Sequence, residues 1–232
     1  MSKNKVKLSD FTVKVLKNHQ TIDNRLFVRK TTDKSGTKII VRSGGIIAMY
    51  DVPESFSENV MSMDLDKILN IHSNMKEPEI ELANNHMNIV DNDDKSNVVL
   101  MYAAPEMVEF PEPPARYPEF VVDFELREQD VTKVLKFADI MGLPSLRFRA
   151  ENGTLYFEAF DADKKTDNSF SLKIAEFKGE DFSAALDRAS FKMIPSDYQV
   201  SIGKPTTFKF VQDTPHGQNV YYVAGVKKHS TI

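Results

Sequence analysis

The chain has 232 residues, of which 41% are hydrophobic and 28% charged, and this composition excludes disordered and collagen-like proteins. It contains no cysteine, which excludes disulfide bonds, thiolate metal sites, cysteine nucleophiles and iron–sulfur clusters. Lys and Arg number 30 against 34 Asp and Glu, so the formal charge is −4 and nucleic-acid binding would need a local basic face. The start lacks the apolar stretch of a signal peptide, and no run approaches the roughly 20 residues of a membrane span, so we expect a cytoplasmic protein without membrane association.

A proline-rich segment near the middle of the chain predicts a domain boundary. Residues 104–118 hold five of the 11 prolines. Proline fixes φ and disfavours helix in the residue before it, so this segment is expected to be an extended, semi-rigid connector. We predict an N-terminal domain at 1–104, a connector at 105–118 and a C-terminal domain at 119–232.

In the first domain, hydrophobic periodicity predicts two helical segments, each followed by three strands. The first helical segment spans Lys7 to Asn18 and the second lies around Lys67 to Asn70. The strand-sized runs of this domain lie at 25–29, 38–42, 46–51, 59–63, 79–82, 87–90 and 98–102.

The second domain repeats the pattern. A helical segment is predicted at 129–141, with an apolar stripe that ends at Met141, and a shorter one carries Arg188 and Lys192 before Pro195 ends it. Its strand-sized runs lie at 120–126, 146–150, 154–160, 170–175, 182–186, 198–202, 206–211 and 220–226. The prediction is an α+β fold of four repeats, each consisting of a strand, a helix and three strands.

Internal similarity supports duplication. The tetrapeptide Lys-Val-Leu-Lys occurs at 14–17 and again at 133–136, with weaker echoes at 67–69 and 192–194. Chance can produce a match this short, but these copies lie at matching points in two similar halves.

The helices carry lysines opposite their apolar stripes. Lys14 and Lys17 face away from Val15 and Leu16, and Lys133 and Lys136 keep the same offset in the second domain. For a single helix, solvated lysines are the ordinary explanation, but their repetition favours a basic lining that can meet phosphates without reading bases. The basic residues predicted for this nucleic-acid-facing lining are Lys7, Lys14, Lys17, Lys67, Lys133, Lys136, Arg188 and Lys192.

Three short motifs, in order, resemble a known family. The start, with Lys7-Leu8-Ser9, Thr12, Leu16-Lys17-Asn18 and Ile22, is similar to the amino terminus of sliding clamps from T-even-type tailed bacteriophages. Phe191-Lys192-Met193-Ile194-Pro195 with Tyr198 and Val200 resembles the fourth helix and following strand of phage clamps. Val220-Tyr221-Tyr222-Val223-Ala224 is similar to the last strand of phage clamps and of the proliferating cell nuclear antigen.

The resemblance implies a homotrimeric ring with helices lining the hole and sheets outside, through which duplex DNA passes. The implied function is processivity: the clamp tethers the replicative DNA polymerase, is loaded by an ATP-dependent clamp loader, and takes no cofactor. Some phage clamps also serve transcription, so transcription factors are further implied partners. A polymerase or loader peptide is expected in an apolar pocket beside the connector, formed by Val41, Ile46, Met107, Val108, Phe110, Tyr222 and Ala224.

The sequence departs from the phage pattern at three places. Asn70 stands at the Lys17-type position of the second helix, and the basic start at 2–5 and the tail at 227–229 are left unexplained. No motif of a catalytic nucleophile, a phosphate-binding loop or a zinc hydrolase occurs, and the histidines lack metal-binding spacing, so we predict a protein that is not an enzyme. The alternative interpretations are a structural β-rich virion protein without a DNA role and, less favoured for lack of aromatic residues among basic ones, a module that binds single strands.

Overall fold

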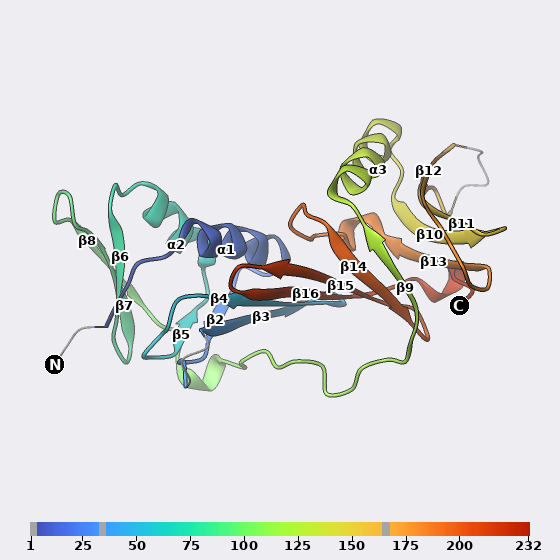
Figure 1. Cartoon of the computed structure of the whole chain (residues 1–232). Helices are drawn as coiled ribbons and strands as arrows, with labels where there is room; N and C mark the ends of the chain where they lie inside the picture. The colour runs from blue at the N-terminus through green and yellow to red at the C-terminus, as the bar shows by residue number, and fades with distance from the viewer. Residues whose placement is uncertain (1–3, 33–35, 164–167) are drawn as a thin grey trace. The chain divides into compact units, whose positions relative to one another are not determined.

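The computed structural model describes residues 4–32, 36–163 and 168–232 (Figure 1). The chain divides into two compact units. Unit 1 is formed by residues 1–43, 47–115 and 214–219, and unit 2 by residues 44–46, 116–213 and 220–232. The proline-rich segment belongs to unit 1 up to Ala115 and to unit 2 from Arg116. The three-part division drawn from the sequence stays a prediction.

The first half of the chain contains two repeats of a strand, a helix and three strands. The first repeat consists of β1 (Asn4–Val6), α1 (Asp10–Ile22), β2 (Leu26–Val28), β3 (Thr37–Ser43) and β4 (Ile46–Val52). The second consists of β5 (Val60–Ser62), α2 (Leu65–Ser73), β6 (Pro78–Leu82), β7 (His86–Asp91) and β8 (Asn97–Met101). A short 3₁₀ turn, η1 (Pro105–Met107), follows.

The second half repeats this order. The third repeat consists of β9 (Phe120–Leu126), α3 (Glu128–Met141), β10 (Ser145–Glu151), β11 (Thr154–Phe160) and β12 (Ser169–Glu176). The fourth consists of β13 (Phe182–Asp187), the 3₁₀ turn η2 (Arg188–Ser190), β14 (Tyr198–Gly203), β15 (Thr207–Thr214) and β16 (Gly217–Ala224), and the chain ends after the 3₁₀ turn η3 (Lys227–His229). The α+β class and the four repeats predicted from the sequence are confirmed.

Two sequence expectations about helices are wrong. The fourth helical segment is only a three-residue 3₁₀ turn, Arg188–Ser190, because Pro195 disfavours a helical conformation at Ile194. Met141, placed on the apolar face of α3, is 39% exposed. It is the last residue of the helix, and Gly142 ends the helix with φ 65°.

Strand pairing follows one rule in all four repeats. The first strand of each repeat pairs, antiparallel, with the first strand after the helix of the other repeat in its unit. The pairs are β1 with β6, β5 with β2, β9 with β14, and β13 with β10. Unit 1 therefore contains the sheet β1-β6-β7-β8, and unit 2 contains β12-β11-β10-β13. This recurrent exchange supports the duplication that the tetrapeptides suggested.

The helices bury their apolar stripes within their own units. In unit 1, α1 and α2 lie side by side, and α1 also contacts β3 (Figure 1). The stripe of α1 is formed by Thr12, Val15, Leu16, His19 and Ile22, all buried. In unit 2, α3 lies over β11 and β12 and buries Val131, Val134 and Ala138. The polar faces of the helices are thereby left exposed.

The core of unit 2 is aromatic. Phe148 of β10 stacks on Phe157 of β11 with ring centroids 4.4 Å apart. Phe208 and Phe210 of β15 lie 6.0 and 6.5 Å from Phe148, so the core joins the sheet of β10 to the sheet of β15. All four rings are fully buried.

Candidate nucleic-acid interface

Helix α1 presents two lysines on its exposed side. Lys14 and Lys17 are exposed, as is Lys7 just before the helix, and none makes an ion pair with a described residue. The start of α1 is fixed by Ser9, whose side chain accepts from the Thr12 N–H, and by Glu54. The Glu54 carboxylate accepts from the Ser9 N–H at 2.6 Å and from the Thr12 hydroxyl at 2.5 Å. Because these bonds define the rotation of the helix, they also define where its lysines point.

Helix α2 is less basic on its exposed side. Lys67 is exposed but lies 3.6 Å from the Asp64 carboxylate. Asn70, at the Lys17-type position, donates from its side-chain amide to Asp66 at 3.0 Å. Asp66 also accepts from Gln20 of α1 at 2.6 Å. These contacts are consistent with the prediction from the sequence that the lysine lining is not uniform.

Lys17 also acts on α2. The pKa of His72, in the last turn of α2, is lowered from its ordinary value by burial of the ring and then by the positive charge of Lys17. Lys17 of α1 therefore influences the ionisation of one side chain on α2.

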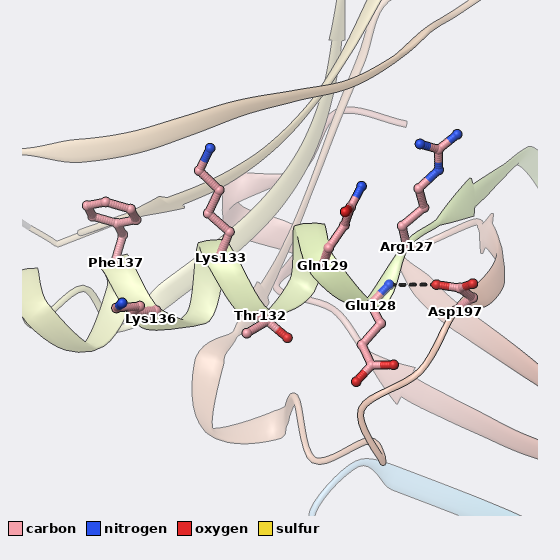
Figure 2. A pocket seen from close by; sticks show the side chains of 8 residues that line it. All are labelled: Arg127, Glu128, Gln129, Thr132, Lys133, Lys136, Phe137 and Asp197. Carbon is pink, nitrogen blue, oxygen red and sulfur yellow. Dashed lines mark hydrogen bonds between the residues drawn. The ribbon is translucent and has the colours of Figure 1, made fainter.

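Helix α3 carries the second lysine pair beside a shallow hollow. The hollow is lined by Arg127, Glu128, Gln129, Thr132, Lys133, Lys136, Phe137 and Asp197. Figure 2 shows Arg127, Gln129 and Lys133 extending from the same side of the helix. Asp197 holds the helix start, where it accepts from the Glu128 N–H at 2.8 Å. Lys133 and Lys136 are exposed and form no ion pair within the described part of the chain.

The two cations of the fourth repeat are placed differently. Arg188 is half-buried and forms an ion pair with Asp139 of α3. Lys192 is half-buried on the segment after η2. Among the helices that the structure describes, α1 and α3 alone carry an exposed lysine pair.

No protein-family model matches the chain. It is 24% identical over 209 residues to the sliding clamp of Vibrio phage KVP40, an alignment that covers 85% of this chain and 90% of the relative. It is 22% identical over 235 residues to the sliding clamp of Escherichia phage RB69, covering 97% of this chain and 99% of the relative. The structure of A. fulgidus PCNA bound to the C-terminal region of FEN-1 superposes with a TM-score of 0.73 over 96% of this chain and 98% of that chain, at 13% identity.

The chain has the sliding-clamp fold. Its similarity to phage sliding clamps extends over nearly the whole chain, as the sequence motifs predicted. The exposed lysine pairs lie on the corresponding helices of the first and third repeats of this fold.

The residues predicted for a peptide pocket of the clamp belong to both units. Val41, Met107, Val108 and Phe110 belong to unit 1, and Ile46, Tyr222 and Ala224 to unit 2. Val41, Ile46 and Tyr222 are buried, Val108 and Phe110 half-buried, and Ala224 exposed, while Met107 is 70% exposed.

Contacts inside each unit give these residues their surroundings. Phe110 lies 6.1 Å from Phe27, ring to ring, and the Arg29 guanidinium lies 4.7 Å above the Phe110 ring. Ala224 donates its N–H to the Gly45 carbonyl at 2.9 Å. This bond joins the turn between β3 and β4 to the last strand, both within unit 2. Whether these residues bind a peptide stays a prediction.

Tyr117 is a candidate that the sequence interpretation missed. Its ring lies 5.3 Å from that of Tyr222, and it is 52% exposed. Burial raises the pKa of Tyr222, and the neighbouring Tyr117 raises it further. An exposed aromatic over a buried one, next to Pro118, forms a surface that suits an apolar peptide side chain. The signal in the sequence was an aromatic residue at the end of the proline-rich segment.

Within the described residues, no helix is both long and apolar enough to cross a membrane. Across the same residues, no group of three or more His, Asp or Glu side chains is arranged to hold a metal ion.

Proposed function

We propose that this chain is a DNA sliding clamp that encircles duplex DNA and tethers the replicative DNA polymerase for processive synthesis. The observation that carries the proposal is the exposed lysine pair repeated on α1 and α3 of a clamp fold. A lining of a few sequence-independent phosphate contacts permits sliding, whereas base contacts would hold the protein in place. In this role the chain supplies a topological tether and carries out no chemistry.

The proposed assembly is a homotrimeric ring closed head to tail. Each unit has a four-stranded sheet, with β8 at one edge in unit 1 and β12 at one edge in unit 2. Strand β8 exposes Val99 by 54% and Met101 by 67%. A bare edge with exposed apolar side chains favours pairing with another chain. Pairing of β8 in one copy with β12 in the next is a heterologous contact, which generates a closed ring when the rotation fits.

The proposed protein partners are the polymerase and an ATP-dependent clamp loader, and the proposed place of action is the cytoplasm of the host cell. The relatives come from phages, and A. fulgidus PCNA binds the C-terminal region of FEN-1. We propose that partner peptides contact this chain at Tyr117 and Tyr222 together with the residues predicted from the sequence. The alternative of a structural virion protein is not favoured, because the relatives are sliding clamps.

Light scattering over a dilution series tests the assembly. A mass of about 79 kDa, three times the 26.4 kDa of one chain, is expected. Retention of the loaded protein on nicked circular DNA, and its release when that DNA is cut, tests encirclement. A protein that stays monomeric at every concentration and is not retained on the circle in the presence of a loader would contradict the proposal.

A further inference from the structure

The two edge strands of the sheet β12-β11-β10-β13 differ in whether another segment of the chain covers their outer side. At one edge, β12 pairs with β11 on its inner side and has no strand on its outer side among the described residues. At the other, β13 pairs with β10 on its inner side, where Ala184 lies opposite Phe148. The outer side of β13 is covered by the C-terminal segment, which we define as Val226–Ile232.

The C-terminal segment satisfies the outward backbone groups in the middle of β13. Ser183 donates its N–H to the Thr231 carbonyl at 3.0 Å and accepts the Thr231 N–H at 2.7 Å. Ala185 donates its N–H to the Ser230 hydroxyl oxygen at 2.9 Å and accepts the Val226 N–H at 2.8 Å. All four groups that a docking strand would use at these two residues are therefore occupied from within the chain.

The path of the chain into this segment is fixed by close packing. A Cβ at Gly225 would lie 2.4 Å from the Thr206 methyl carbon and 2.9 Å from the Ala185 carbonyl oxygen, so only glycine fits here. The Ser230 hydroxyl also donates to the Val226 carbonyl at 2.8 Å, which closes the segment around η3. The contact with β13 is thus a defined structure of several coupled hydrogen bonds.

We infer that the C-terminal segment is an edge cap that keeps a second copy of this chain from docking on β13. The inference rests on the proposed ring, in which β8 of one copy pairs with an edge of unit 2 in the next. Without the cap, the sheet would offer β8 two acceptors, β12 and β13, and an assembly with two choices at each contact would branch or fail to close. β13 has six residues and β8 five, so their lengths match. The basic tail at 227–229, unexplained by sequence, is the turn that returns the chain to β13.

The test compares the full chain with Thr231→Pro and Thr231→Ala. Proline removes the N–H that bonds to Ser183, whereas alanine keeps it. A chain ending at Gly225 removes the C-terminal segment altogether. Amide exchange at Ser183 and Ala185 is expected to rise about tenfold or more in the proline and truncated proteins, and to stay unchanged in the alanine protein. Sedimentation velocity is expected to show species larger than the trimer for the same two proteins only.

A second variant identifies the docking strand. Adding Val99→Lys to the truncated chain places a charge on the β8 edge and is expected to abolish the larger species. Larger species that persist with Val99→Lys would overturn β8 as the occupant. A truncated protein with the mass distribution of the full chain, or with Ser183 still protected, would overturn the edge cap. A full chain that is monomeric would instead contradict the proposed ring, while exchange at Ser183 would still report on the cap.

Discussion

Replacing Lys133 and Lys136 of α3 by glutamine tests the proposed DNA lining directly. Both side chains are exposed and lack ion pairs within the described part of the chain, so each substitution is expected to change the free energy of unfolding by no more than about 0.5 kcal/mol. The fold and the trimer should therefore survive, and any change in DNA binding can be assigned to the lost charges.

The expected effect on DNA binding follows from counterion release. Each lysine that neutralises one phosphate contributes about 0.9 to the slope of log affinity against log salt. Loss of the pair should lower the slope by about 2 per protomer that contacts the duplex. At about 0.15 M salt, the same relation makes each contact worth roughly fivefold, so the pair accounts for about 30-fold in affinity per protomer.

The assay is fluorescence anisotropy with a labelled linear duplex at a series of salt concentrations, followed by polymerase extension on long primed templates. The matched control is the pair Lys178→Gln and Lys204→Gln, two exposed lysines of the same unit outside the helix. The control should keep the slope and the extension length. An α3 variant with the slope of the control would refute the proposed contact between this helix and phosphate.

Three further predictions concern the peptide surface, the sheet that carries β12, and pH. Tyr117→Ala should weaken binding of a polymerase C-terminal peptide about tenfold, as for an interface aromatic, with an unchanged unfolding temperature; unchanged affinity in calorimetry would place the pocket elsewhere. Glu158→Ala should lower the free energy of unfolding by about 3 kcal/mol in urea titrations, because this buried carboxylate binds Arg147, Arg149 and the Ser171 hydroxyl of β12. A loss below about 1 kcal/mol would contradict that role. Burial lowers the pKa of His19 below its ordinary 6.5. As the pH falls below 6.5, the unfolded chain therefore binds a proton at His19 that the folded chain does not bind, and the free energy of unfolding should fall by up to about 1.4 kcal/mol per pH unit. The variant His19→Gln should reduce this dependence, and identical pH profiles would count against it.

The strands could be predicted because alternation and turn residues mark them locally, but two elements depend on distant parts of the chain. Strand β1 has only three residues, and its sequence carries no alternating pattern of useful length. It is a strand because it pairs with β6, which lies far along the chain. A 2.8 Å ion pair between Lys5 and Glu79, 74 residues apart, also joins the two strands. The C-terminal segment likewise takes its structure from β13. Neither contact is visible in a local pattern.

The lysine pairs of the site could be predicted from helical periodicity, whereas the tyrosine pair could not. Lys14 and Lys133 follow from the position of each apolar stripe, and burial of Val15 and Val134 confirms those stripes. The contact between Tyr117 and Tyr222 joins residues far apart in the chain. Their pairing depends on the path of the proline-rich segment, and the sequence does not specify that path.

Strand exchange between repeats also explains how the lysines keep their positions. Each repeat gives its first strand to the other repeat of its unit, so one repeat alone lacks a strand of its own sheet. Two helix starts are also bound by the other repeat of the unit. Asn24 of the first repeat accepts from the Asp66 N–H of α2, and Asp197 of the fourth repeat accepts from the Glu128 N–H of α3. Because the first repeat holds the start of α2 and the fourth holds the start of α3, we expect the two repeats of a unit to fold together and the lysines of α3 to keep their direction only while the fourth repeat is in place.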